Sequence, residues 1–251
     1  MAPLALLGES FPGRPALDTA VSRALLVRAA RGEVPETLRI YRPDPVVAFG
    51  RQDVASRGFQ EAVMAARDRG FASVVRLAGG RAAVFHEGTI AFALTRPDPD
   101  PTSRTFARFR EMADVMASAL RRLRIDAHVG EVPGEYCPGD YSVNARGKKK
   151  LVGIGQRLIS LAAHTGGVLV ATGAERVTEV LVPVYDALAI EWRPETAGSV
   201  EEESGAGWGP AREALITEFE ERYGLIKGGL DRETLALAES LEDDHRIPAR
   251  G

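Results

Sequence analysis

The sequence predicts an α+β fold in which a mixed, mostly antiparallel sheet is flanked by helices. Strand-like and helix-like segments follow one another without the regular alternation that a parallel sheet requires. Several strand-like segments are separated only by short turn signals, which is typical of antiparallel hairpins. With 251 residues, 45% of them hydrophobic, the chain is long enough to bury a sizeable core.

Helices in the first half of the chain are predicted by apolar residues at spacings of three and four. Leu17, Val21 and Leu25 recur in this way within residues 14–31, and Gly32 follows as a stop signal. A second helix is predicted at residues 59–69. Short apolar runs bounded by turn residues predict four strands, at residues 38–41, 46–49, 72–77 and 89–94.

The second half begins with the most regular helical pattern, at residues 104–123. Its apolar stripe is predicted to face the core and comprises Phe106, Phe109, Met112, Met116, Leu120 and Leu123. A β-hairpin is predicted from residues 140–145 and 150–159, and a strand at 167–172. We expect a helix after residue 173 to end at Pro183, because proline removes a helical donor.

The last third is predicted to become helical after an acidic loop. Residues 196–209 contain four glycines and the acidic run 201–203, and this composition predicts a loop. Two further helices are predicted at residues 210–223 and 231–241, which together form a short helical C-terminal tail.

Composition excludes several classes of protein. The net charge of −3 argues against a general nucleic-acid binder. No apolar run is long enough to cross a membrane, and residues 1–10 lack the basic start of a signal peptide. The single cysteine cannot form an intrachain disulfide, which fits a reducing compartment, and we expect a cytoplasmic protein. No His/Cys cluster has metal-binding spacing, so no metal site is predicted.

A first candidate site follows the strand that ends near residue 77. Gly79 and Gly80 allow a backbone to approach a ligand closely, and Arg76 and Arg81 offer cations to a carboxylate or phosphate. His86 comes a few residues later, followed by Glu87. The residues alone leave two interpretations open, a ligand-binding loop or a plain turn beside a packed histidine.

A second candidate site joins the only cysteine to a lysine. Cysteines are usually buried and inert, but Cys137 lies in a loop between Gly134 and Gly139, where exposure is more expected than usual. Lys150 begins an apolar strand, and from that position it could reach a ligand or lower the pKa of a thiol. Gly153 and Gly155 leave one face of this strand bare. Lys148 and Lys149 are interpreted as solvated charges at a hairpin tip.

At these residues the sequence resembles the biotin/lipoate attachment superfamily, which includes lipoate-protein ligases and cysteine-dependent octanoyltransferases. The resemblance runs from about residue 14 to residue 190. Its most specific elements are the segment 76–81, called here the arginine–diglycine loop or glycine loop, with the following His86, and the strand that begins at Lys150 and reaches Gln156. The matching segments are ALDTAVSRALL (16–26), RPDPVVAFGRQ (42–52), RLAGGRAAVFH (76–86), KLVGIGQR (150–157) and TGGVL (165–169).

The chain departs from the family pattern at several positions. An acidic residue of the first helix is replaced at Ser22, and the aspartate after the loop histidine is Glu87. The histidine before the late glycine is Thr165, with His164 one place earlier. The glycine loop carries one extra residue before His86.

The resemblance implies a lipoate-ligase-like catalytic domain at residues 1–195, followed by an acidic linker and a short helical region at 196–251. It implies the attachment of an octanoyl or lipoyl group to a lysine of a carrier domain. That carrier would belong to a 2-oxoacid dehydrogenase or be the glycine cleavage H protein. The substrate-binding residues implied are Arg76, Gly79, Gly80, Arg81, His86, Gly153, Gly155 and Gln156.

Two chemistries compete within the superfamily. In the preferred one, Cys137 takes the acyl group from acyl carrier protein as a thioester, Lys150 polarises the carbonyl, and no cofactor is needed. In the alternative, an ATP- and Mg²⁺-dependent ligase forms lipoyl-AMP, Lys150 contacts its carbonyl, and Cys137 is a bystander. A third interpretation is a non-catalytic scaffold that only binds a lipoyl domain. The sequence leaves the choice between an octanoyl and a lipoyl substrate open.

Overall fold

The structure is a computed structural model that describes residues 3–247. Its larger sheet is mixed and mostly antiparallel, as predicted, and only the pairings of β11 with β1 and of β1 with β2 are parallel. Within the described residues it contains eight strands, in the spatial order β11 (Leu225–Lys227), β1 (Leu4–Leu7), β2 (Thr37–Tyr41), β6 (Thr89–Pro97), β10 (Ala162–Val170), β9 (Lys149–Ile159), β8 (Val143–Ala145) and β7 (Ala127–Val129).

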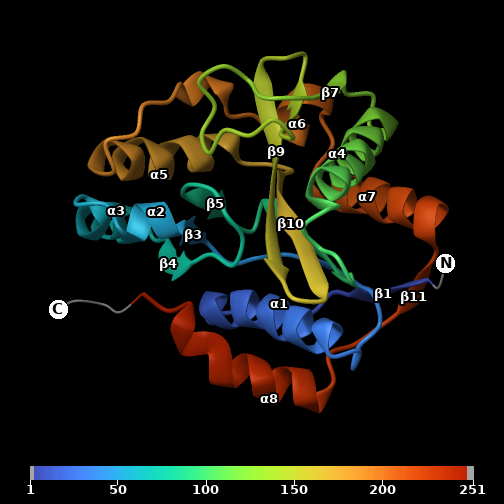
Figure 1. The fold of residues 1–251 in the computed structure, drawn as a ribbon. Coiled ribbons are helices and arrows are strands. Elements are labelled where there is room, and N and C mark those ends of the chain that lie inside the picture. The colour runs from blue at the N-terminus through green and yellow to red at the C-terminus, as the bar shows by residue number, and fades with distance from the viewer. Residues whose placement is uncertain (1–2, 248–251) are drawn as a thin grey trace.

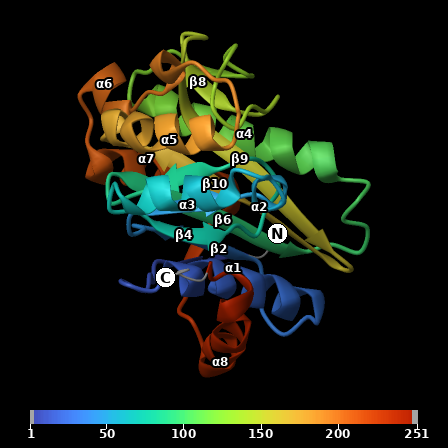
Figure 2. The ribbon, with the colours of Figure 1, turned by 90° about the vertical axis from the view of Figure 1, so that its left-hand side faces the viewer.

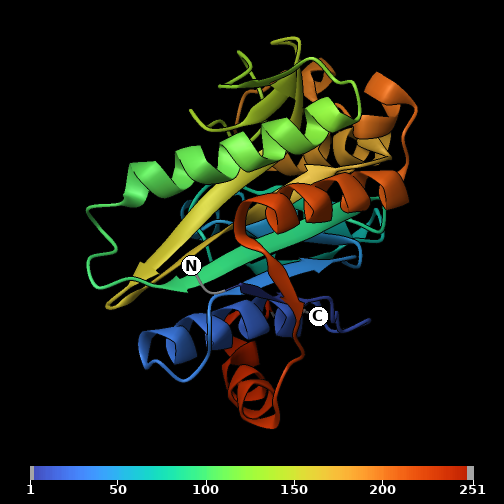
Figure 3. The same cartoon turned by 90° about the vertical axis from the view of Figure 1, so that its right-hand side faces the viewer.

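Helices cover both faces of this sheet (Figures 1 and 3). One face packs against α4 (Thr105–Arg122) and α7 (Trp208–Tyr223), which share the largest apolar cluster with the sheet. The opposite face packs against α1 (Pro15–Ala30), which is covered in turn by α8 (Arg232–Leu241). The predicted helices at 14–31, 104–123, 210–223 and 231–241 are therefore confirmed to within two residues.

A smaller sheet lies beside the larger one and carries its own apolar cluster. Its strand order is β4 (Ala72–Val75), β3 (Val46–Phe49) and β5 (Ala83–Phe85). The helices that pack on it are α3 (Phe59–Arg67) and α5 (Ala174–Ala187), and the short helix α2 (Arg51–Val54) follows β3. Figure 2 views this side of the molecule and shows α3 and α5 stacked beside the sheet.

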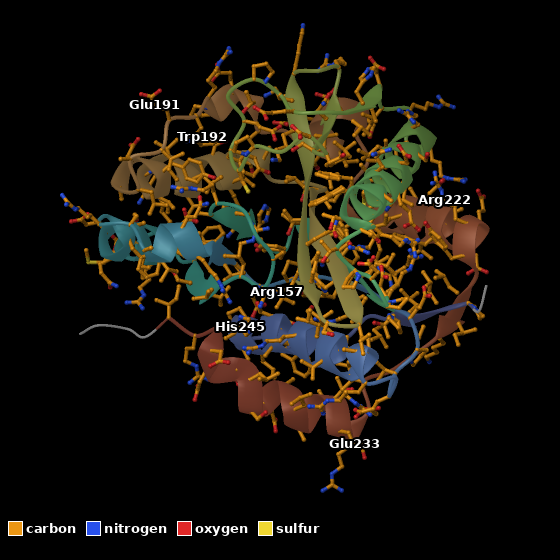
Figure 4. The ribbon with its side chains drawn as sticks, in the orientation of Figure 1. Arg157, Glu191, Trp192, Arg222, Glu233 and His245 are labelled. Carbon is orange, nitrogen blue, oxygen red and sulfur yellow. The ribbon has the colours of Figure 1, made fainter. Side chains whose placement is uncertain are left out.

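The chain after residue 195 adds a strand to the larger sheet and helices on both of its sides. It begins within a 3₁₀ turn, η1 (Pro194–Thr196), and continues with α6 (Val200–Ser204), α7, β11 and α8, and a second 3₁₀ turn, η2 (Glu242–Asp244). The loop predicted at 196–209 is wrong over α6. This helix starts because Ser199 and Glu202 cap each other's backbone N–H groups, at 3.2 and 2.9 Å. Beyond α8, the carbonyl of His245 (labelled in Figure 4) accepts a hydrogen bond from the Val75 N–H at 2.9 Å.

The expectation that a helix ends at Pro183 is wrong, because α5 continues to Ala187. Proline at this position leaves the carbonyl of Glu179 without its helical donor. The guanidinium of Arg69, just beyond α3, replaces that donor, with its Nε 2.8 Å from the Glu179 oxygen. A tertiary contact from the segment that follows α3 therefore supplies the hydrogen bond that proline removes.

The apolar stripe of α4 is only partly a core feature. Met112, Met116 and Leu120 are buried as predicted, but Phe106 is 64% exposed and Phe109 is half-buried. Both of these rings line a cavity instead. Among the described residues, no helix combines the length and the apolar character needed to cross a membrane.

We predict that Arg69→Met lowers the free energy of unfolding by about 0.5–1 kcal/mol, because the Glu179 carbonyl loses its donor. Urea denaturation measures this loss. In a Pro183→Ala background residue 183 regains an N–H that can bond to Glu179, so the cost of Arg69→Met should shrink. Equal costs in the two backgrounds would show that the arginine does not compensate for the proline.

Candidate active site

Three cavities meet at Arg76, which lies just after β4. The thiol cavity, about 450 Å³, is lined by Cys137, Lys150 and Phe106 among others. The arginine cleft is lined by Arg51, Arg81 and Arg157, and Arg157 on β9 is labelled in Figure 4. The apolar pocket lies between α1 and the sheets and is lined by Tyr41, Phe85, Phe92, Ala93, Val46 and His164. Because Arg76 lines all three cavities, its guanidinium marks the junction between them.

Cys137 is held in a backbone conformation that side chains seldom adopt. Its φ is +43°, in the left-handed region, and the residue is half-buried. The Sγ atom accepts a hydrogen bond from the Arg81 backbone N–H at 3.2 Å and one from Arg76 Nη1 at 3.6 Å. Both donors stabilise negative charge on sulfur. The structure therefore brings Cys137, Arg76 and Arg81 together.

The Lys150 ammonium contacts the loop that carries Cys137 (residues 134–139, the cysteine loop) but makes no hydrogen bond to the sulfur. Its buried ammonium donates to the Glu135 carboxylate at 2.8 Å and to the carbonyls of Tyr136 and Cys137 at 2.9 and 2.8 Å. These three bonds use all three protons of the ammonium group. In this arrangement Lys150 fixes the backbone of the loop, and the groups that face the thiol come from the glycine loop instead.

Glu135, the counter-ion of Lys150, was not predicted from the sequence. Its side chain is fully buried and also accepts hydrogen bonds from Ser142 Oγ at 2.5 Å and from the Val132 N–H at 3.0 Å. Tyr185 of α5 was not predicted either; its hydroxyl accepts from the Cys137 N–H at 3.0 Å and donates to the Ala82 carbonyl at 2.9 Å. No local pattern marks either residue, because each is defined by a partner from a distant segment.

The two glycines of the arginine–diglycine loop differ in their surroundings. Gly80 has φ +113°, and a Cβ there would lie 2.9 Å from both the Cys137 sulfur and Arg76 Nη1. Its carbonyl oxygen also packs so closely on Gly50 that a Cβ on Gly50 would lie 1.8 Å away. A Cβ on Gly79 meets nothing within 4 Å. Gly80 is therefore required for close approach, whereas Gly79 borders open space.

The strand β9 forms the opposite wall. A Cβ on Gly155 would lie 3.2 Å from Arg76 Nη2, and one on Gly153 would lie 3.6 Å from the Lys150 side chain. The Gln156 side chain is held by α4, because it donates to the Thr105 carbonyl at 2.9 Å and accepts from Arg108 at 3.1 Å. All three residues line the thiol cavity, and Gln156 also lines the arginine cleft.

His86 is the candidate residue that the structure separates from the others. It is buried, lies outside the three cavities formed by the described residues, and its Nδ1 accepts the Gly88 N–H at 3.0 Å. Burial lowers the pKa of His86, and the charge of Arg176 lowers it further. Glu87 forms an ion pair with Arg176 on the surface. His86 thus supports the turn between β5 and β6.

The far wall of the apolar pocket carries a buried polar cluster. Arg39, 1% exposed, pairs with Asp18 at 3.0 Å and donates to Ser22 Oγ at 3.0 Å. Burial lowers the pKa of His164 to about 4, with a contribution from Arg39, and its Nδ1 lies 3.3 Å from Thr95 Oγ1. His164 lines this pocket and Thr165 lines a cavity beside α4 and α7, because neighbouring strand residues point to opposite faces.

Among the described residues, no group of three or more histidine, cysteine, aspartate or glutamate side chains is arranged to hold a metal ion. The cavities are instead bordered by an isolated thiol, several arginines and bare glycine backbone. Such a set of groups suits acyl transfer, since it combines one nucleophile with cationic and backbone N–H donors.

Residues 14–197 match the family model of the lipoyl protein ligase A/B catalytic domain, and the chain belongs to this family. The octanoyltransferase LipM of Kyrpidia tusciae is 30% identical over 254 residues, covering 91% of each protein. An octanoyl-[GcvH]:protein N-octanoyltransferase of Geobacillus kaustophilus is 30% identical over 140 residues, 56% of this chain and 49% of that protein. The chain thus spans about half the length of the first curated relatives it matches.

Solved structures show the same fold. A lipoate-protein ligase A bound with ATP superposes with a TM-score of 0.76 at 22% identity, covering 97% of this chain and 95% of that one. A putative lipoate protein ligase from T. acidophilum with bound lipoic acid gives 0.74 at 24% identity, covering 97% and 96%. The predicted ligase-like α+β fold is therefore confirmed.

We predict that Lys150→Met lowers the free energy of unfolding by about 3–5 kcal/mol, because it leaves the Glu135 carboxylate buried without its counter-ion. The exposed Lys148→Met is the matched control and should change stability by less than about 0.5 kcal/mol. Chemical denaturation of both variants tests this. Similar values for the two would contradict the role of Lys150 in the loop.

The buried His164 predicts a loss of stability in acid. Its pKa is about 4 in the folded chain and about 6.5 when unfolded, so the unfolded state binds more protons between these values. The free energy of unfolding should therefore fall as pH drops from about 6.5 to about 4. Denaturation at pH 7 and 4.5 should show that His164→Gln removes up to about 3 kcal/mol of this loss. The exposed His128→Gln should keep the full loss.

Proposed function

We propose that this chain transfers an octanoyl or lipoyl group to a lysine of a lipoyl carrier domain through a thioester on Cys137. The observation that carries the proposal is the sulfur's position. Sγ faces a cavity and accepts hydrogen bonds from the Arg81 N–H and from Arg76, at the junction of an apolar pocket with a basic cleft. The names of the octanoyltransferase relatives support the same reaction class.

In the proposed reaction, the Cys137 thiolate attacks the carbonyl carbon of an acyl thioester. A new C–S bond forms, the donor's C–S bond breaks, and the donor leaves as a thiol after taking up a proton. The amine of the acceptor lysine then attacks the acyl-enzyme, which gives an amide and returns Cys137 to its thiol form. The route uses neither ATP nor Mg²⁺, and acyl carrier protein in the cytoplasm is the proposed donor.

Each cavity has a role in this proposal. The apolar pocket takes the hydrocarbon part of the acyl group, because its walls are mostly apolar as far as the cluster around Arg39. The thiol cavity holds the reacting carbonyl. The arginine cleft gives the donor and the acceptor access, and it offers cations to partners that carry negative charge.

Lys150 was expected to polarise the acyl carbonyl, and we propose a different role for it. All three ammonium protons already form hydrogen bonds. Lys150 can therefore contact an acyl oxygen only if its hydrogen bond to the Tyr136 or Cys137 carbonyl breaks. We propose that Lys150 chiefly holds the loop. Arg76 and the Arg81 N–H, which already lie at the sulfur, then stabilise the charge that develops on the acyl oxygen.

The acceptor is proposed from the relatives' names. Several curated relatives are named for GcvH, the glycine cleavage H protein. We propose that protein, or the lipoyl domain of a 2-oxoacid dehydrogenase, as the source of the lysine. Both present a lysine on a folded domain, which would reach Cys137 through the open side of the glycine loop.

The test is intact mass spectrometry after incubation with octanoyl-acyl carrier protein. We expect an octanoyl adduct that hydroxylamine removes and that passes to added carrier domain. Cys137→Ser should form no labile adduct and lose transfer, because a serine with no base beside it is a poor nucleophile. Cys137→Ala is the matched control for changes in the loop and should fail in the same way.

Two outcomes would reject the proposal. ATP-dependent lipoylation that persists in Cys137→Ser would identify a ligase in which the thiol is a bystander. Binding of carrier domain without acyl transfer from either donor would identify a scaffold.

A further inference from the structure

We propose that Asp53 is a positioning residue for Cys137, acting through the side chain of Arg81. This inference rests on the proposed function, since it concerns how the nucleophile is prepared. Asp53 belongs to none of the sequence motifs that carry the family resemblance, and it does not touch the sulfur. Its effect is transmitted by one ion pair and one backbone N–H.

Asp53 is a fully buried carboxylate in the short helix α2, which follows β3. One oxygen, Oδ2, accepts the Gly50 N–H at 2.9 Å, and the other, Oδ1, lies 2.9 Å from Arg81 Nε. Burial raises the pKa of Asp53, and Gly50, Arg81 and Arg76 oppose that shift. A buried carboxylate is costly unless it is paired, so the position of Arg81 is strongly restrained.

Arg81 connects this carboxylate to the thiol. Its side chain pairs with Asp53 and donates to Gln52 at 3.2 Å, while its backbone N–H donates to Cys137 Sγ. Its carbonyl accepts from Arg76 Nη1 at 2.8 Å, and the same nitrogen lies 3.6 Å from Sγ. Fixing Arg81 therefore fixes both hydrogen-bond donors of the sulfur.

The backbones of the two loops leave no room for independent movement at this point. Gly80 packs its carbonyl directly on Gly50, where a Cβ could not fit. Asp53 caps the N–H of that same Gly50. A shift of α2 is thus passed to the glycine loop, and from there to the N–H that faces the sulfur.

A helix cap alone is the competing explanation for Asp53, and asparagine distinguishes the two. The side-chain amide introduced by Asp53→Asn retains an oxygen that can accept the Gly50 N–H, so the cap survives. The ion pair does not survive, because the amide carries no charge. Loss of the negative charge by itself would favour a thiolate, whereas loss of the donors' alignment disfavours it. The direction of the change therefore separates positioning from simple electrostatics.

The experiment measures the rate at which iodoacetamide alkylates Cys137 as a function of pH. Cys137 is the only cysteine, so the mass increase reports that thiol alone. The charged or titratable groups in or facing its loop, which stay constant among the variants apart from Arg81, are Arg76, Arg81, Glu135, Tyr136, Asp140, Tyr141, Lys150 and Tyr185. No acyl substrate is involved.

We expect Asp53→Asn to move the midpoint of the alkylation profile upward by about one pH unit, the size of one weakened charge-assisted hydrogen bond. Arg81→Met should produce the same shift, and the double variant should shift no further, because both changes break one connection. Arg81→Lys, which can still pair with Asp53, should recover part of the wild-type profile.

Asp231→Asn is the matched control. Asp231 also caps a helix and pairs with an arginine, Arg28, but on α8 away from the thiol. It should leave the profile unchanged. An unchanged or downward midpoint in Asp53→Asn, additive shifts in the double variant, or the same shift in Asp231→Asn would overturn the proposal. Failure of the thioester mechanism would appear separately, as transfer that survives Cys137→Ser.

Discussion

The candidate site depends on one buried ammonium group. Lys150, at the start of β9, binds the Glu135 carboxylate and the carbonyls of Tyr136 and Cys137. A buried charge is stable only when all its hydrogen-bond partners are in place. Loss of one of the three bonds should therefore weaken the other two. The three bonds hold Cys137 at a positive φ, and that conformation turns its sulfur toward the glycine loop. The position of the Cys137 sulfur thus depends on the three hydrogen bonds that the Lys150 ammonium donates to the loop.

Helix α5 couples the two loops on either side of the thiol. Tyr185 binds the Cys137 N–H and the Ala82 carbonyl with a single hydroxyl, so it spans the cysteine loop and the glycine loop. Trp192, labelled in Figure 4, packs against Tyr136 and Tyr185 with ring centroids 5.8 and 5.6 Å away. Tyr185 reaches this place only because α5 continues past Pro183. The contact that Arg69 makes with Glu179 is therefore connected to the site through the helix itself.

The features that could be predicted from sequence are those encoded by nearby residues. Periodicity is a local signal, and it predicted α1, α3, α4 and the hairpin of β8 and β9. The residue types and their spacing singled out Cys137, Lys150 and the arginine–diglycine loop, and a resemblance to known motifs supplied their roles, which remain predictions. Asp53, Glu135 and Tyr185 could not be found, because each matters through a partner brought near by folding. The same reason explains why α5 continues past Pro183: the hydrogen bond that proline removes is replaced by Arg69, which lies just beyond α3.

The apolar pocket meets the arginine cleft and the thiol cavity at Arg76. This arrangement suggests an order of steps for the proposed reaction. An acyl chain in the apolar pocket is shielded from water and can stay in place while its carbonyl carbon changes partners. The arginine cleft and the thiol cavity share Gly79, Gly80 and Pro138, and in the proposed reaction both the donor and the acceptor approach from this side. Two folded carrier proteins cannot occupy one entrance together. A covalent acyl-enzyme removes that conflict, since it keeps the acyl group on Cys137 while one carrier departs and the next arrives.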